Sequence, residues 1–323
     1  MGRQQAQVFV TGGAGCVGHY LIEQLLAGGW RVHALVRDPG RLRADLLARV
    51  EVIRGDLADP AGWASRLGGM DAAVLAAAAW GGPEAHKVNA AATWRILDDL
   101  DPDRCRRVVY LSTASVLGPG GAPLAAAAEH GTEYIRSKHA ALAGIQGTRT
   151  GSRVVTLFPT VILGGDERHP LSSASRGLRD FRPYLGVLRF VSLDGRFHVV
   201  HAHDVARAAV HFLEAAELPA PPVVLGIPAL GAGEAMARLA RLAGHGPAPQ
   251  IDLTPLARIL PALLPHKFTP WDRYCLAHRD LSYPVCDLAA LLGPSGFETL
   301  EGILAGPGTG DSPAPEVACA PSP

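Results

Sequence analysis

The chain has 323 residues, of which 48% are hydrophobic and 19% charged, so general disorder is excluded and one large α/β domain, alone or with a smaller appendage, is expected. Thirty Lys and Arg residues balance thirty Asp and Glu residues, so no overall field would attract nucleic acid or an anionic membrane surface. The longest nearly apolar run, residues 70–82, is too short to span a bilayer, and we expect no transmembrane segment.

The first residues and the cysteines predict where the protein works. Residues 1–7 are polar and lack the succession of basic, apolar and small residues that marks a signal peptide. The five cysteines are widely spaced and include no Cys-x-x-Cys pair, which favours a reducing compartment. We therefore expect a cytoplasmic protein.

Apolar runs rich in β-branched residues alternate with segments of helical period through the first half of the chain. They predict strands at residues 7–11, 31–37, 50–54, 72–77, 107–112 and 153–158. This rhythm is typical of a parallel sheet with helices on its faces.

Three glycines, Gly12, Gly15 and Gly18, lie between the first strand and the first helix. Gly12 permits a sharp turn, Gly15 lets backbone approach a pyrophosphate, and Gly18 allows the helix to lie close to the strand. The amides that open the helix, at Cys16 and Val17, would face the anion. Glycine-rich turns also occur without ligands, but this one opens the first βαβ unit and predicts a dinucleotide site.

The end of the second strand distinguishes the two nicotinamide dinucleotides. An acidic side chain there would bind the ribose hydroxyls of NAD, but this strand ends Val36-Arg37. Arg37, with Arg41 or Arg43 nearby, can offer a guanidinium fork to a 2′-phosphate, so NADP is favoured over NAD. The alternative is that these arginines are solvated surface charges.

Asp56 and Leu57 follow the third strand at the same predicted edge. The Asp56 carboxylate would accept a hydrogen bond from the adenine amino group, and we expect both residues to contact the cofactor. Helix capping by Asp56 or Asp59 is an equally good explanation.

Tyr134 and Lys138 lie four residues apart, on one face of a predicted helix. A tyrosine hydroxyl with its ordinary pKa near 10 is a poor base, but a neighbouring ammonium and an oxidised nicotinamide would both favour the phenolate. A hydroxyl from residues 112–115, after the fifth strand, would orient the substrate oxygen during hydride transfer. The isolated pair would otherwise be a helix surface pair.

The order of Thr-Gly-x-x-Gly-x-x-Gly, Ser-Thr-Ala-Ser-Val and Tyr-x-x-x-Lys resembles the extended short-chain dehydrogenase/reductase superfamily, in its epimerase/dehydratase group. Asn89, Pro159 and residues 200–206 are similar to further motifs of that family. The resemblance implies an α/β fold with a Rossmann-type doubly wound parallel sheet and a smaller C-terminal substrate lobe. It also implies Thr113 as the hydroxyl that polarises the substrate.

The same resemblance implies Tyr134 as the acid/base, Lys138 as its partner and ribose ligand, and Pro159 in a cofactor-binding loop. Some positions depart from the family pattern. Ala114 and Ser115 follow Thr113 where sugar-nucleotide dehydratases have Asp-Glu, which makes that dehydration improbable. Residues 31–41, in contrast, resemble the NADP-dependent reductase branch that acts on ketones.

The domain organisation follows from these motifs. We expect a NAD(P)-binding core at residues 1–165 and a substrate lobe, interleaved with returning core elements, at residues 166–305. Residues 306–323 are rich in Pro and Gly and predict a disordered tail. His201, His203 and Asp204 do not predict a metal site, because Asp204 is better explained as a helix cap.

The expected activity is that of an NADP-dependent oxidoreductase, which reduces a carbonyl or oxidises a secondary alcohol of a small molecule. A nucleotide-sugar epimerase is the enzymatic alternative, and a dinucleotide-binding sensor or assembly protein without turnover is the other. Apolar residues of 253–264, with Phe268 and Trp271, predict a proline-bent lid over a largely apolar substrate. Helices at 89–100 and 134–145 predict a homodimer, with intrachain packing as the alternative.

Overall fold

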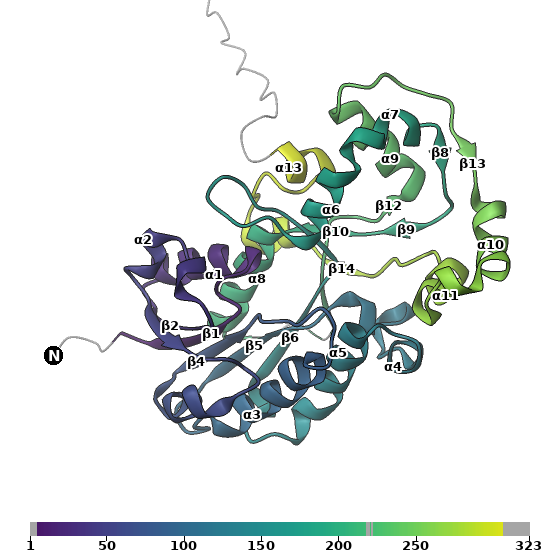
Figure 1. The fold of residues 1–323 in the computed structure, drawn as a ribbon. Coiled ribbons are helices and arrows are strands. Elements are labelled where there is room, and N and C mark those ends of the chain that lie inside the picture. The colour runs from purple at the N-terminus through teal and green to yellow at the C-terminus, as the bar shows by residue number, and fades with distance from the viewer. Residues whose placement is uncertain (1–4, 218–219, 221, 306–323) are drawn as a thin grey trace, which may run out of the picture.

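The computed structural model describes residues 5–305 except 218, 219 and 221 (Figure 1). The predicted disordered tail at 306–323 lies outside the described residues. Among the described residues, no helix is both long and apolar enough to cross a membrane.

Eight of the described strands form one parallel sheet in the order β14-β11-β6-β5-β4-β1-β2-β3. The sheet starts with β1 in its interior, β2 and β3 are added on one side of β1, and the strands from β4 onward are added on the other side. The strand order therefore reverses between β1 and β4, which is the topological switch point where such sheets bind ligands. The Rossmann-type, doubly wound α/β fold is therefore confirmed. The strands are β1 (Gln7–Thr11), β2 (Arg31–Val36), β3 (Glu51–Arg54), β4 (Ala72–Leu75), β5 (Arg107–Leu111), β6 (Val154–Pro159), β11 (Val223–Leu225) and β14 (Val285–Cys286).

Both faces of this sheet are buried, because successive side chains of each strand point to opposite faces. Val8 and Val10 of β1 join the core beneath α1 (Cys16–Ala27) and α8 (Ala202–Glu214). Phe9 joins the core on the other face, with α3 (Ala92–Asp99) and α5 (Glu133–Gly144). Figure 1 shows the sheet between these helix layers.

Three of the six predicted strands were too long at their carboxyl ends. The expected strands extended to residues 37, 77 and 112, whereas β2, β4 and β5 end at Val36, Leu75 and Leu111. There the backbone leaves the ladder for other partners: the amide of Ala77, for example, donates to Thr11 Oγ1 at 3.2 Å. These ends form the edge of the sheet that carries the candidate site.

The second half of the chain adds a smaller lobe beyond β6, and β11 and β14 return from it to the main sheet. Leu163, Val199, Leu230, Phe297 and Leu300 form its separate apolar core. Three two-stranded sheets join β7 (Val161–Leu163) to β10 (Val199–His201), β9 (Arg196–Phe197) to β12 (Leu230–Gly231) and β8 (Val191–Ser192) to β13 (Ile251–Asp252). The boundary at residue 165 stays a prediction.

The remaining helices complete the two parts. Those of the first half are short, α2 (Ala44–Leu47) and α4 (Ala125–Glu129). Those of the lobe and its return are α6 (Ser173–Phe181), α7 (Leu185–Leu188), α9 (Ala232–Leu242), α10 (Thr254–Leu263), α11 (Pro270–Ala277), α12 (Leu288–Leu292) and α13 (Leu300–Ala305).

Helix α10 occupies the segment for which a proline-bent lid was expected. It continues through Pro261, although proline is expected to interrupt a helix interior. Its Leu256, Ile259 and Leu263 are exposed, so these side chains of the apolar stripe are not packed into a core. Whether α10 closes over a substrate stays a prediction.

Candidate active site

The glycine loop joins the carboxyl end of β1 to α1. Gly12 has φ +77°, and a Cβ there would lie 2.7 Å from the backbone that follows β4. A Cβ on Gly18 would clash with the Gly12 carbonyl oxygen. Among the described residues no side chain caps α1 at Gly15, so the first amides of the helix, at Cys16 and Val17, can face an anion. The loop has the form of the predicted phosphate cradle.

Arg37 and Asp56 follow β2 and β3 and form an ion pair, with 3.7 Å between Nη1 and Oδ2. Their side chains are 74% and 44% exposed, so both can reach a ligand. Asp56 also accepts the amide of Ala58 at 2.9 Å, whereas Asp59 caps the short helical turn that begins at Pro60. The capping explanation therefore holds for Asp59, and Asp56 has a local backbone role as well as its ion pair with Arg37.

Two neighbours of that pair are fixed by the fold. Arg43 donates to Glu23 and Asp45 and is engaged with them, so of the two further arginines only Arg41 is exposed near Arg37. Leu57 packs against the buried cluster on the face of the sheet that α3 and α5 cover.

Thr113 and Tyr134 bring two hydroxyls together beyond the end of β5. Thr113 is buried, and its Oγ1 accepts the amide of Ser115 at 3.3 Å. Burial raises the pKa of Tyr134 to about 12, and a hydrogen bond with the Thr113 side chain acts in the opposite direction. Burial thus favours the protonated hydroxyl, and a phenolate favoured by an ammonium and an oxidised nicotinamide stays a prediction.

Lys138 lies one turn along α5 from Tyr134 and is buried beneath it. Its Nζ donates to the Leu111 carbonyl at 2.7 Å and lies 4.7 Å from the centroid of the Tyr110 ring. Burial lowers the pKa of Lys138 to about 7. The hydroxyls of Tyr110 and Ser112 are also buried and lie next to one another. Ser112 is thus a packed neighbour, as expected, while Tyr110 was missed.

Asn89 lies on a π-helical turn, Lys87–Ala91, that leads into α3. Its amide nitrogen donates to the Ala79 carbonyl at 2.8 Å and to Ser137 Oγ at 2.9 Å, and its oxygen accepts the Ala79 amide at 2.8 Å. Asn89 therefore ties the loop after β4 to α5, the helix of the candidate acid/base. Such π-turns are frequent at functional sites.

Trp80 follows Ala79 in that loop, and its indole stacks on the Tyr134 ring with 4.6 Å between centroids. The sequence offered no pattern that singled it out, because it stands alone after an alanine run. An exposed tryptophan next to the Tyr-x-x-x-Lys helix becomes evident only from the fold.

Pro159 ends β6, and the chain then returns toward α1. In this return His169 stacks on Tyr20, with 3.7 Å between centroids, and its Nε2 lies 2.9 Å from a Glu23 oxygen. The return therefore packs next to the glycine loop, where Pro159 was expected to contact the cofactor. Burial, as the largest cause, raises the pKa of Cys16 to about 12, which does not suit a nucleophilic thiol.

The histidines near the start of α8 have structural roles. His201, not Asp204, caps the helix, because its Nδ1 accepts the amide of His203 at 3.2 Å. Asp204 was expected to be the cap, but its carboxylate accepts a hydrogen bond from Ser295 Oγ at 2.8 Å. Within the described ranges no cluster of three or more His, Cys, Asp or Glu side chains could hold a metal ion.

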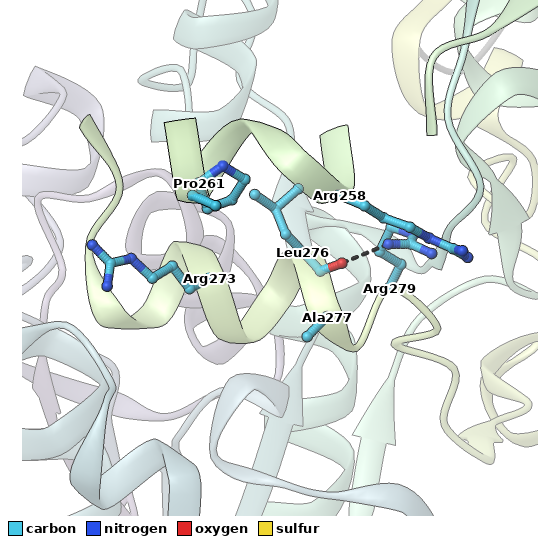
Figure 2. A pocket seen from close by; sticks show the side chains of 7 residues that line it. Arg258, Pro261, Arg273, Leu276, Ala277 and Arg279 are labelled. Carbon is cyan, nitrogen blue, oxygen red and sulfur yellow. Dashed lines mark hydrogen bonds between the residues drawn. The ribbon is translucent and has the colours of Figure 1, made fainter. Parts of the chain in front are cut away.

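A hollow lies away from these residues, between α10 and α11 (Figure 2). It measures about 560 Å³ and is lined by Arg258, Pro261, Ala262, Arg273, Leu276, Ala277 and Arg279. None of the predicted site residues lines it. We place the candidate site at the carboxyl edge of β1, β4 and β5, where the hydroxyls and the glycine loop meet.

Comparison with known proteins agrees with this geometry. A ketoreductase of Stigmatella aurantiaca, named for 4-hydroxy-2-methyl-3-oxo-4-farnesyl-3,4-dihydroquinoline-1-oxide, is 27% identical over 223 residues. The alignment covers 65% of this chain and 64% of that protein, so the chain spans less than two thirds of the relative's length.

Two solved structures share the fold. The crystal structure of gox2253 has a TM-score of 0.70 at 21% identity and covers 90% of this chain and 93% of its own. MoeE5, in complex with UDP-glucuronic acid and NAD, has a TM-score of 0.64 at 21% identity, with 93% and 97% covered. The model of the NAD dependent epimerase/dehydratase family matches residues 8–226. The chain therefore belongs to this family of extended short-chain dehydrogenase/reductase enzymes.

Proposed function

We propose that the protein is an NADP-dependent oxidoreductase that reduces the carbonyl group of a small molecule, or oxidises the corresponding secondary alcohol. The observation that carries the proposal is the meeting of the Thr113 and Tyr134 hydroxyls above buried Lys138, at the sheet edge that also carries the glycine loop.

The residues present fit a dinucleotide. The positive φ of Gly12 and the backbone packed against it exclude a side chain there, as expected of a loop whose backbone approaches a pyrophosphate. In this proposal the cofactor is held by Gly12, Gly15, Cys16, Val17, Arg37, Asp56, Leu57, Lys138 and Pro159. When bound, the cofactor supplies or accepts the hydride.

The proton chemistry of Tyr134 favours reduction. Because burial raises its pKa to about 12, the hydroxyl keeps its proton at neutral pH and can donate it to the oxygen of a carbonyl as that carbonyl is reduced. The Thr113 hydroxyl would donate a hydrogen bond to the same oxygen and orient it. Lys138, fixed on the Leu111 carbonyl, would hold the ribose and support the tyrosine.

NADP is proposed over NAD because of Arg37. Its exposed guanidinium is paired only loosely, at 3.7 Å, with Asp56. A 2′-phosphate would offer Arg37 a charge-assisted, bidentate partner, and NAD would not.

A ketone is the favoured substrate class. The curated relative is named as a ketoreductase of a dihydroquinoline oxide that bears a farnesyl chain, which supports both a carbonyl and a largely apolar molecule. Epimerisation of a nucleotide sugar is the second candidate, supported by the family and by the UDP-glucuronic acid bound to MoeE5.

The remaining parts of the proposal concern organisation. We propose a cofactor-binding part at residues 1–165, a substrate lobe at residues 166–305 and a homodimer in the cytoplasm. The cysteines of the described residues, Cys16, Cys105, Cys275 and Cys286, are free thiols, which supports a reducing compartment.

The test is a panel of ketones, secondary alcohols and UDP-sugars, each with NADPH and with NADH, followed by mass spectrometry of the products. The proposal predicts stoichiometric oxidation of NADPH with formation of an alcohol. A UDP-sugar converted without net cofactor oxidation would establish the epimerase, and cofactor binding without turnover on any compound would favour the non-catalytic alternative.

A further inference from the structure

Trp80 is exposed at an unusual place for a tryptophan. Its side chain is 67% exposed, although it stacks on the Tyr134 ring with 4.6 Å between centroids and 26° between planes. A large aromatic surface that stays in water gains little for folding. Its apolar surface therefore borders the candidate acid/base and faces solvent.

The loop that carries Trp80 is held on both sides. Before it, Asn89 makes two hydrogen bonds to the backbone of Ala79, both of 2.8 Å. After it, the amide of Gly82 donates to Glu133 Oε2 at 2.5 Å. Glu133 directly precedes Tyr134 on α5, so these contacts fix the indole relative to the tyrosine.

Ordering this loop costs conformational entropy, and packing of the exposed indole offsets little of that free energy. The surroundings of Tyr134 are also aromatic on the side of the second lobe. Trp271 of α11 and Tyr283 pack against the same buried cluster as Tyr134. A molecule whose carbonyl oxygen reaches the hydroxyls of Thr113 and Tyr134 would thus meet aromatic surface next to that carbonyl.

We propose that Trp80 is a specificity-determining residue that selects planar aromatic carbonyl compounds by stacking on the ring next to the carbonyl group. An indole face attracts a flat conjugated ring more strongly than a saturated ring of the same skeleton. This inference deepens the proposed function and rests on it, because it uses the same carbonyl site.

The experiment separates binding from turnover. Protein saturated with NADP⁺ is titrated by calorimetry with 2-acetylnaphthalene and with 2-acetyldecalin, which share a carbon skeleton but differ in aromaticity. With oxidised cofactor neither ketone can be reduced. Wild type is expected to bind the aromatic ketone about three- to tenfold more tightly, the range of an aromatic pair.

Three variants test the residue. Trp80→Leu should bring the two dissociation constants to within about twofold, and Trp80→Phe should retain most of the preference. Trp30→Leu, which removes an indole from the opposite face of the main sheet, should leave the preference unchanged. Far-UV circular dichroism verifies that each variant is folded.

The inference is overturned if wild type binds both ketones equally, or if Trp80→Leu keeps the wild-type preference. It is also overturned if Trp80→Leu binds both ketones more tightly than wild type and by the same factor, because Trp80 would then only shield Tyr134. A parallel assay with NADPH keeps the two ideas apart. If wild type prefers the aromatic ketone in binding but reduces no ketone with NADPH, the role of Trp80 is supported and the proposed reductase activity is contradicted. If it reduces ketones without a binding preference, the reductase activity is supported and the role of Trp80 is contradicted.

Discussion

Arg37 and Asp56 form an ion pair across the carboxyl ends of β2 and β3, with 3.7 Å between Nη1 and Oδ2. The Arg37 side chain is mostly exposed and that of Asp56 is partly exposed, so the pair itself adds little stability. It does set the charge that a bound nucleotide would meet. Arg37 attracts a 2′-phosphate, and Asp56 opposes it.

Replacing each partner should change cofactor affinity in opposite directions. Arg37→Ala should weaken NADPH binding by about 1.5–3 kcal/mol, the scale of a lost charged hydrogen bond, and leave NADH nearly unchanged. Asp56→Asn should tighten NADPH, because the repulsion of the phosphate is removed while the amide oxygen can still accept the hydrogen bond of the adenine amino group. Dissociation constants from calorimetry test this, and equal losses for both cofactors in Arg37→Ala would reject the 2′-phosphate contact.

The buried ammonium of Lys138 should make the protein's stability depend on pH. Burial lowers its pKa to about 7 from an ordinary value of 10.5. Between these values the unfolded chain holds the proton and the folded chain does not, so the free energy of unfolding rises with pH in this window. Below about pH 7 the destabilisation is at its largest.

Lys138→Met removes this group while it keeps most of its volume. The variant should be more stable than wild type near pH 6, and the difference should shrink steadily toward pH 10. Urea unfolding of both proteins across that range measures it. A difference that is the same at every pH would show that Lys138 is not desolvated as described.

The predicted homodimer has a direct test on α5. Ala141 is buried within the chain, where its carbonyl accepts a hydrogen bond from Trp94 Nε1 at 3.0 Å, whereas Ala143 is exposed. Ala143→Arg should dissociate the dimer, and Ala48→Arg, on an exposed position after α2, should not. Light scattering at micromolar concentration decides, and a monomeric wild type would refute the dimer.

Tyr134→Phe isolates the hydroxyl from the aromatic ring. The ring and its stacking with Trp80 stay, so cofactor binding and fold should be unchanged. Turnover should fall by about 10²- to 10⁴-fold, the usual contribution of a positioned acid or base. Ser112→Ala is a matched control, because it removes a buried hydroxyl of the same region to which the proposal gives no part in the proton transfer. Turnover near that of wild type would exclude Tyr134 as the proton donor.

The sheet and its cofactor edge could be predicted because each depends on local pattern. Runs of β-branched residues predicted the strands of the first half, and three spaced glycines predicted the loop between β1 and α1. In the structure the backbone packs so closely at Gly12 and Gly18 that a Cβ at either position would clash. Other features depend on contacts between distant segments. The stacking of Trp80 on Tyr134 and the hydrogen bond from Asn89 to Ser137 join segments that lie more than forty positions apart in the sequence.

Burial explains the remaining differences. Burial raises the pKa of Tyr134, and this effect cannot be read from a Tyr-x-x-x-Lys spacing. The cap of α8 was assigned to Asp204 from residue preference. In the structure the Ser295 hydroxyl binds that carboxylate and His201 caps the helix instead.

The central claim is that the protein transfers a hydride between NADPH and a carbonyl carbon while Tyr134 supplies the proton. The most direct test uses NADPH that carries deuterium at the transferred position of C4, with aryl and alkyl ketones as substrates and mass spectrometry of the alcohols. Wild type should give an alcohol with one deuterium on the carbinol carbon and one NADP⁺ per product, and Tyr134→Phe should give almost none. Absence of deuterium from every product, or equal incorporation by Tyr134→Phe, would contradict the account.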